Sequence, residues 1–273
     1  SIPSDVYHLL RQSPLKPLTP VEMRSLWFSR DELCSHSQGL GALLRAVDWS
    51  RYEQVQELYS LLQYWVPLPA SLALNLLGPE TVDPNVRAFA VRQLEIMEDF
   101  ELSIFMLHLT HALKFETYVD SALARFLLRR SFLSPDTIGH ALFWCLKSEM
   151  SMEEGATIRH RFGIIISQYL RCCGSAHREV LGHELWLMNR LAGISHAVKS
   201  ISGTSAGKKA VAERQKHARF LLAELNHAFP PGGIRLPLSC SSTMPFDEQD
   251  GGTTNHHSTT TGITISTASS STY

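Results

Sequence analysis

The sequence predicts an all-α protein, built as a solenoid of stacked antiparallel helix pairs of the HEAT or armadillo kind. Apolar residues recur at steps of three and four from about residue 40 to 229. No alternating apolar and polar run, typical of a strand, interrupts this region. Helix pairs recur every roughly 30 to 45 residues, which suits a HEAT-like or armadillo-like array. No sequence repeat accompanies this spacing, so a compact helical bundle remains the alternative.

The first elements have recognisable ends. One face of the first long helix consists of Val55, Leu58, Leu62 and Trp65. Pro67 and Pro69 end this helix, because proline lacks the backbone donor and crowds the preceding turn. A short helix over residues 70–77 stops at the Gly78-Pro79 pair, and Asp83 then caps a helix that has Pro84 at its first position.

The middle of the chain continues the pattern. A single helix is predicted from near Asp99 to Leu113, and another from Ser121 to Ser131. Ser134 and Pro135 repeat the cap-plus-proline start of the next helix, in which we expect Trp144 to lie in the core. Further stripes follow at residues 158–169, 185–198 and 211–225, which completes about ten helices of roughly 10 to 18 residues.

The two ends of the chain differ from this pattern. We assign residues 1–15 to a linker, 16–229 to the helical domain, and 230–238 to an extended segment. Residues 239–273 are rich in Ser and Thr and poor in large apolar groups, so they are predicted to be disordered. Residues 200–209 are predicted to form a loop between the last two helices.

Composition excludes several classes of protein. With 25 basic and 26 acidic residues, the chain lacks the basic surface of a nucleic-acid-binding protein. No apolar run approaches the roughly 20 residues needed to span a bilayer. The five cysteines include the adjacent Cys172 and Cys173, which is a poor disulfide framework and favours a reducing, cytoplasmic location.

No motif predicts a catalytic, cofactor-binding or metal-binding residue. Residues 203–209 resemble a phosphate-binding loop, but a residue is missing before the Gly-Lys pair and no Ser or Thr follows it. Asp99-Phe100-Glu101 lacks the glycine of a kinase metal-binding motif, and an acidic helix start explains it. His140 and Cys145 on one helix, with Cys172 and Cys173 further on, lack the close pair of ligands typical of a zinc site. The cysteines are interpreted as small buried apolar side chains.

One local basic stretch needs an explanation. It consists of Arg125, Arg129 and Arg130, with Lys114 nearby in sequence. A solvated helix face, or ion pairs with Glu116 and Asp120, is the favoured interpretation. Contact with an acidic membrane or with a partner protein is the alternative.

Several blocks together resemble the helical accessory domain of phosphoinositide 3-kinases. The matching blocks are Leu26-Trp27, Trp65-Val66-Pro67-Leu68 with residues 73–77, Asp83 to Val91, Lys114-Phe115-Glu116, Asp120-Ser121, Leu123 to Leu128, Ile138-Gly139-His140, Phe143-Trp144 and Lys147-Ser148-Glu149. The resemblance is close over residues 15–175 and looser up to 238. Residues 138–150 are similar to class I enzymes, whereas residues 172–174 and 186–189 are similar to class II.

The resemblance implies a scaffold. Residues 16–229 would be the accessory domain of an ATP-dependent lipid kinase that phosphorylates the inositol 3-hydroxyl. Its partners would be the flanking lipid-binding and kinase domains and a regulatory protein, and the intact enzyme would be cytoplasmic and peripheral at membranes. ATP and a divalent metal would belong to the kinase domain. Residues 235–238 resemble the strand that enters that domain, but the Ser/Thr tract follows it, so we expect this chain alone to be inactive. A stand-alone, catalytically inert helical scaffold is the alternative.

Overall fold

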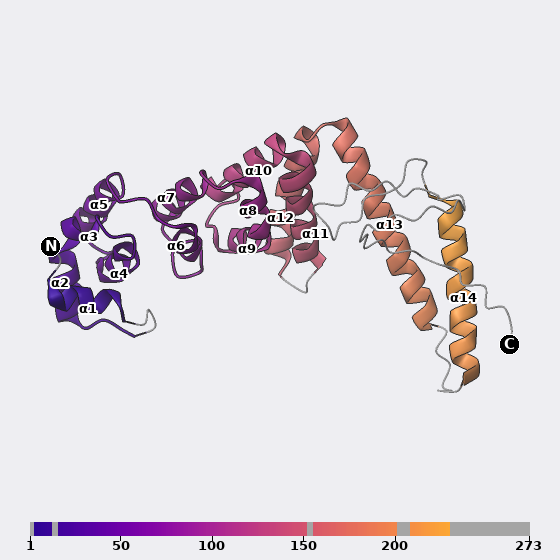
Figure 1. Cartoon of the computed structure of the whole chain (residues 1–273), viewed down its shortest axis with the longest axis horizontal. Helices are drawn as coiled ribbons and strands as arrows, with labels where there is room; N and C mark the ends of the chain where they lie inside the picture. The colour runs from indigo at the N-terminus through magenta and orange to yellow at the C-terminus, as the bar shows by residue number, and fades with distance from the viewer. Residues whose placement is uncertain (1–2, 13–15, 152–154, 201–207, 230–273) are drawn as a thin grey trace, which may run out of the picture. The chain divides into compact units, whose positions relative to one another are not determined.

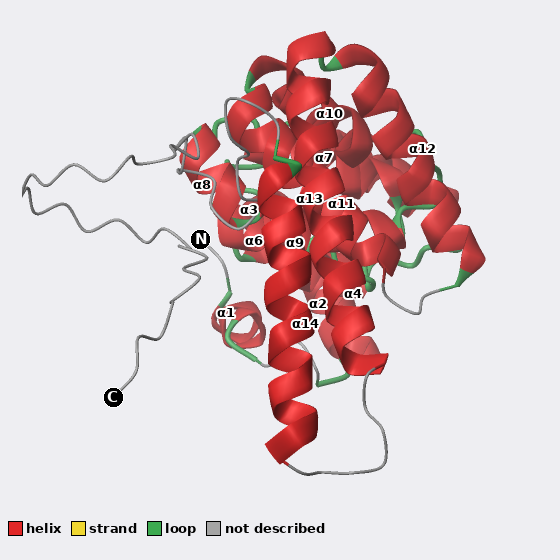
Figure 2. Cartoon of the chain, turned by 90° about the vertical axis from the view of Figure 1, so that its right-hand side faces the viewer, coloured by secondary structure: helices red, strands yellow, loops and turns green. Residues whose placement is uncertain are grey.

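The computed structural model describes residues 3–12, 16–151, 155–200 and 208–229. These residues form helices and connecting segments without a strand, so the all-α prediction is confirmed for the part of the chain described (Figure 2). Where we expected one helical domain over residues 16–229, the chain divides into two compact units, Ser1–Gly174 and Ser175–Tyr273.

Helices α1 to α12 belong to the first unit, and their bounds are as follows (Figure 1). They are α1 (Ser4–Leu10), α2 (Pro20–Phe28), α3 (Arg30–Leu33), α4 (Gly39–Ala46), α5 (Tyr52–Leu61), α6 (Ala70–Asn75), α7 (Pro84–Leu94), α8 (Asp99–Ile104), α9 (Met106–Ala112), the 3₁₀ turn η1 (Leu113–Phe115), α10 (Ala122–Leu133), the π-helical turn η2 (Pro135–Gly139), α11 (His140–Ser151) and α12 (Ala156–Cys172).

Helices of the first unit pack mainly on near neighbours in the chain. In its first part α2 packs on α4 and α6 on α7, and further along α7 packs on α10, α9 on α11 and α12 on both α10 and α11. Such short-range stacking suits the predicted solenoid, because each helix buries its stripe against adjacent helices. The solenoid itself stays a prediction.

The amino-terminal residues differ from the predicted linker. Residues 4–10 form α1, whose Val6 and Leu9 are buried and which packs on α2 and α4. Because the stripe contains only two apolar residues one helical turn apart, the sequence pattern was too short to distinguish this helix from a linker.

Helix starts follow the capping rules at most predicted positions. The side chain of Asp83 accepts hydrogen bonds from the backbone N–H groups of Asn85 and Val86, with Pro84 at the first helical position. Ser121 caps α10 in the same way, through the N–H of Ala124. The predicted cap at Ser134 is wrong: its hydroxyl bonds to the carboxylate of Asp99, and a π-helical turn begins at Pro135 instead.

The helix predicted from Asp99 to Leu113 is broken in two. Phe105, with φ −88° and ψ 1°, separates α8 from α9. Two residues earlier, the Ser103 hydroxyl donates to the carbonyl of Phe100 at 2.7 Å. A serine hydroxyl that bonds a carbonyl of the preceding turn bends a helix, which gives a physical reason for the break.

Trp144 is only partly buried, so its assignment to the core is wrong. Leu142 and Leu146 are buried, as expected, together with the neighbouring Phe143. Trp144 lies two positions after Leu142, which is about 200° around an α-helix and therefore on the opposite side. Its ring contacts that of Phe143 edge to face, with centroids 5.3 Å apart.

The second unit contains two long helices, α13 (Ser175–Ser200) and α14 (Lys208–His227), which pack on each other. Their shared core is small. Leu187 and Leu225 are buried, and the partly buried side chains of Trp186, Leu222 and Phe229 pack against them. Among the described residues, no helix has the length and apolarity that crossing a membrane requires. The predicted loop at 200–209, apart from its ends, and the assignments for residues 230–238 and 239–273 lie outside the described residues.

Candidate functional site: a buried arginine network at residues 112–116

Arg87 on α7 is the largest charged side chain in the core, with 2% of its surface exposed. Its Nε donates to Glu116 Oε1 at 2.9 Å, and one terminal nitrogen lies 2.9 Å from the same oxygen. That nitrogen also donates to the carbonyl of Ala112 at 3.1 Å. The other terminal nitrogen is held at 3.0–3.1 Å by the carbonyls of Leu77, Gly78 and Thr81. Every guanidinium nitrogen therefore has an acceptor, which makes burial of the charge tolerable.

Local structure explains how α7 presents this side chain. The cap at Asp83 sets the start of α7, and Val86, Phe89 and Ala90 on the same helix are buried. Arg87 lies among them, one position after Val86, so its stem crosses the apolar core before its head reaches polar groups. The Tyr59 hydroxyl donates to Asp83 at 2.6 Å, which ties α5 to this cap.

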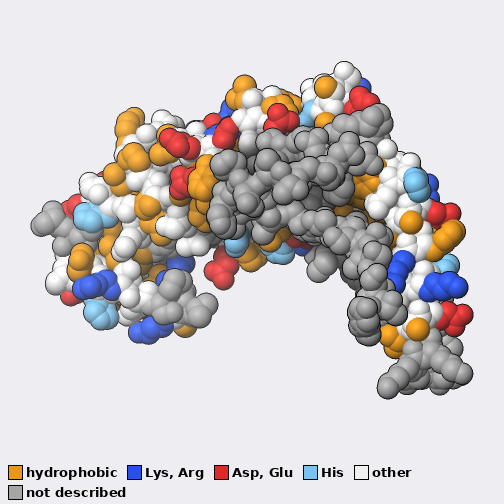
Figure 3. Space-filling model, turned by 45° about the vertical axis from the view of Figure 1, so that its right-hand side comes forward, with side chains coloured by type: hydrophobic (Ala, Val, Ile, Leu, Met, Phe, Trp, Pro, Cys, Tyr) orange, Lys and Arg blue, Asp and Glu red, His pale blue; other side chains and the backbone are white. Residues whose placement is uncertain are grey.

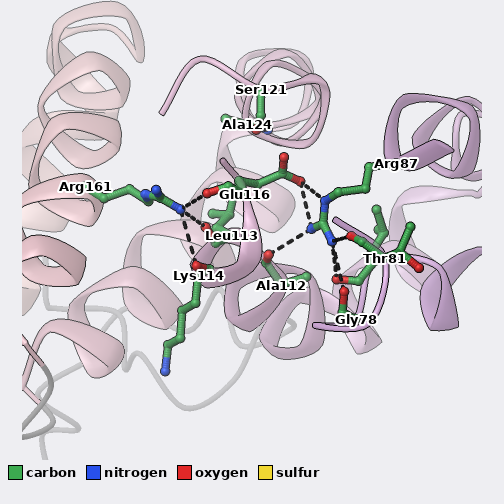
Figure 4. Close-up of polar contacts among 11 residues, drawn as sticks. Gly78, Thr81, Arg87, Ala112, Leu113, Lys114, Glu116, Ser121, Ala124 and Arg161 are labelled. Carbon is green, nitrogen blue, oxygen red and sulfur yellow. Dashed lines mark hydrogen bonds and ion pairs between the residues drawn. The ribbon is translucent and has the colours of Figure 1, made fainter. Parts of the chain in front are cut away.

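Arg161 on α12 approaches the same segment from another helix (Figure 4). One of its terminal nitrogens donates to the carbonyls of Leu113 at 2.8 Å and Glu116 at 2.6 Å, with Lys114 at 3.4 Å. Residues 112–116 end α9 and form η1, and carbonyl groups at the end of a helix carry its negative dipole end. The carbonyl of Leu113 also accepts from the N–H of Glu116 at 3.4 Å. Two arginines from distant parts of the chain supply further donors to these carbonyl groups.

A third link connects the same segment to α11. The ammonium group of Lys114 pairs with Glu149, and both side chains are largely buried. Residues 112–116 are thus held by side chains from α7, α11 and α12, which a single stretch of sequence could not provide. Figure 4 shows Arg87 and Arg161 reaching this segment from opposite sides.

The network joins residues that belong to separate motif blocks in the sequence. Arg87, Lys114, Glu116 and Glu149 come from three of the motif blocks and meet around one turn. Arg161 was missed, because it lies in none of those blocks. A charged residue directly before the buried Phe162 of the α12 stripe was the signal that could have found it.

The predicted basic stretch is largely neutralised by ion pairs. Arg125 pairs with Asp120, as predicted, while Arg129 pairs with Glu95 and Arg130 with Asp99. Lys114 pairs with Glu149, and Glu116 pairs with Arg87 rather than with a residue of the stretch. These pairs weaken the alternative that the stretch faces an acidic membrane. On the face shown in Figure 3, basic and acidic side chains are interspersed.

Asp99 has an electrostatic role in place of the metal-binding role that its motif suggests. A hydrogen bond from the Ser134 hydroxyl, followed by one from the Arg130 guanidinium, lowers the pKa of its carboxyl below the ordinary value of 3.8. Arg130 also donates to the carbonyl of Met97 at 2.7 Å. Asp99 therefore fastens the start of α8 to the end of α10.

The remaining sequence candidates lie apart from the network. His140 is buried at the start of α11, Cys145 is partly buried and Cys173 is buried. Cys172 is exposed, so its predicted burial is wrong. In the described part of the chain, no three His, Cys, Asp or Glu side chains are grouped so that they could hold a metal ion. Most of the phosphate-loop-like segment 203–209 lies outside the described residues.

The family model and the similar known proteins all belong to the phosphoinositide 3-kinases. Residues 2–182 match the model of the phosphoinositide 3-kinase family accessory domain (PIK domain). The chain is 33% identical over 212 residues to phosphatidylinositol 3-kinase 2 of Dictyostelium discoideum, and 36% identical over 188 residues to phosphatidylinositol 3-kinase 1 of the same organism. These alignments cover 78% and 69% of this chain but 11% and 12% of the relatives.

The match covers the network completely, because Arg87, Glu116 and Arg161 all lie within residues 2–182. It also covers the whole first unit from residue 2 to Gly174. The chain belongs to the phosphoinositide 3-kinase family and contains its helical accessory domain.

Proposed function

We propose that this chain acts as the rigid helical spine of a phosphatidylinositol 3-kinase. In the intact enzyme, the kinase domain would transfer the γ-phosphate of ATP to the 3-hydroxyl of an inositol lipid, with ATP and a divalent metal bound in that domain. The accessory domain would hold the lipid-binding and kinase domains at fixed positions. The enzyme would be cytoplasmic and would contact membranes peripherally, with a regulatory protein as a further partner.

The network around residues 112–116 is the observation that supports a spine. Helices that pack only through apolar stripes can slide, because the hydrophobic effect has no directional preference. Hydrogen bonds from Arg87 and Arg161 have directions and specific acceptors. Since these arginines come from α7 and α12, they fix the relative positions of helices 74 residues apart in the sequence.

A chimera tests this function. Residues 4–229 replace the accessory domain of an active relative, phosphatidylinositol 3-kinase 2 of Dictyostelium discoideum, and the product is assayed with labelled ATP, magnesium and phosphatidylinositol vesicles. We expect 3-phosphorylated lipid from the chimera and none from the 273-residue chain alone. A chimera that folds, as shown by a cooperative thermal melt, but makes no lipid product would contradict the proposal.

Turnover by the isolated chain above a no-protein control would also contradict it. A chimera with Arg87→Met tests whether the arginine network contributes to lipid kinase activity. Its lipid kinase activity should fall more than that of a chimera with Arg125→Ala, which removes only an exposed ion pair.

A further inference from the structure

Helices α8 and α9 are apolar on two opposite sides. Their inner side is buried and consists of Leu102, Met106, Leu109 and, at the start of η1, Leu113. Their outer side carries Phe100, Ile104 and Leu107, which are 78%, 60% and 53% exposed. We call these three residues the outer ridge.

Two residues of the outer ridge share one helical face, and the third lies on the next helix. Phe100 and Ile104 are four positions apart within α8, so their side chains are neighbours. Leu107 follows in α9, beyond the break at Phe105, and Ile96, 83% exposed, lies in the connection before α8. Apolar residues on two sides of a helix normally find packing partners on both sides. Helices α8 and α9 are covered on a single side in the described structure.

Acidic side chains flank one end of the outer ridge. Glu95 and Asp99 are engaged by Arg129 and Arg130. Glu98 and Glu101 are exposed and form no ion pair with any described residue. An apolar face with two uncompensated carboxylates at one end is complementary to an apolar face with positive charges at the matching end.

We propose that the outer ridge is a docking site for an amphipathic helix of a partner protein. The partner helix would lay apolar residues at steps of three and four against Phe100, Ile104 and Leu107, and place lysine or arginine beside Glu98 and Glu101. The proposal is independent of lipid kinase activity, because it rests on exposure, spacing and charge alone. Anionic lipid fits the site poorly, since the two carboxylates would repel it.

Two synthetic helical peptides test the docking site on the full 273-residue chain. Both have the same leucine ridge; one has lysines beside it and the other has glutamates. Binding of each labelled peptide is measured by fluorescence anisotropy. We expect the lysine peptide to bind about tenfold more tightly than the glutamate peptide, or better. The charge-neutral double variant Glu98→Gln, Glu101→Gln should reduce that preference.

The double variant Phe100→Ser, Ile104→Ser should weaken binding of the lysine peptide about tenfold or more. The matched control is Phe28→Ser, because Phe28 is also 78% exposed but lies at the end of α2. Its affinity should equal that of the parent chain. Thermal melts check that all variants stay folded, and because the substituted positions are exposed, their melting temperatures should match that of the control.

Four results would overturn the proposal. The first two are equal affinity of the parent and the Phe100, Ile104 double variant, and equal affinity for the two peptides. The third is a dimer of the chain in sedimentation that only the double variant abolishes, which would identify a second copy as the occupant. The fourth is binding to phosphatidylserine vesicles that the same variant removes, which would identify a membrane.

Discussion

Arg87 and Glu116, 29 positions apart, form an enclosed ion pair at 2.9 Å that joins α7 to the turn after α9. Both side chains are more than nine-tenths buried. In such a pair, the cost of removing two charges from water is offset by the mutual attraction and by the carbonyl acceptors around Arg87. The pair therefore contributes mainly by specifying how these helices meet, and removing one partner should be far more costly than removing an exposed pair.

Replacing Arg87 with methionine should lower the free energy of unfolding by about 3–5 kcal/mol, because it leaves Glu116 charged and buried without a partner. Urea denaturation followed by far-ultraviolet circular dichroism measures this. Arg125→Ala is the control: its pair with Asp120 is 74% and 69% exposed, so the loss should be only about 0–1 kcal/mol. The double variant Arg87→Met, Glu116→Leu should recover part of the stability. If Arg87→Met and Arg125→Ala lost the same free energy of unfolding, the buried pair would contribute no more to stability than an exposed one.

Gly139→Ala should destabilise the first unit by about 1–3 kcal/mol, because the added methyl group overpacks the core. A Cβ at this position would lie 2.0 Å from the Tyr169 hydroxyl and 3.0 Å from the Ser131 carbonyl. Burial also raises the pKa of Tyr169, in keeping with a hydroxyl enclosed by these neighbours. Thermal melts of the variant provide the measurement.

Gly163 on α12 provides a control in which the same substitution should raise stability instead of lowering it. A Cβ there would meet only the Met150 methyl group, at an ordinary 3.8 Å. Gly163→Ala should therefore stabilise the helix by up to about 1 kcal/mol through its better helix propensity. Tyr169→Phe should partly rescue Gly139→Ala, since it removes the closest atom. Without any rescue, the close approach to the Tyr169 hydroxyl is not the cause.

Asp83→Ala should cost about 0.5–2 kcal/mol, because it removes the cap of α7. It also deprives the Tyr59 hydroxyl of its acceptor. Asp83→Asn should lose less, since its side-chain oxygen can still accept from the N–H groups of Asn85 and Val86. Urea midpoints of the three proteins test this order. If the asparagine variant were as unstable as the alanine variant, the charge rather than the cap would matter.

Asp99 should make stability depend on pH in the acidic range. Because its pKa is lowered in the folded chain, its contribution is present above the unfolded pKa and is lost as pH falls through the folded pKa. The stability difference between the parent chain and Asp99→Asn should therefore shrink from about pH 5 towards pH 2. Urea denaturation across this range checks it, and a pH-independent difference would contradict the assignment.

The sequence alone determined the helical class, several helix starts such as those of α7 and α10, and the family. Steps of three and four identify helices whatever they pack on, and caps such as Asp83 with Pro84 act within one turn, so both are readable locally. The family motifs were readable for the same reason, since they are short stretches of residues close together in the chain.

Only the tertiary structure decided where these residues meet. Arg87 and Arg161 converge on residues 112–116 through packing between helices that are far apart in sequence, and no local pattern encodes such a contact. The same reason explains the errors. Ser134 is a good cap by its local sequence, yet its hydroxyl bonds to Asp99, 35 positions earlier. Phe100 and Ile104 look like core residues by type, but their exposure depends on which side of α8 the other helices cover.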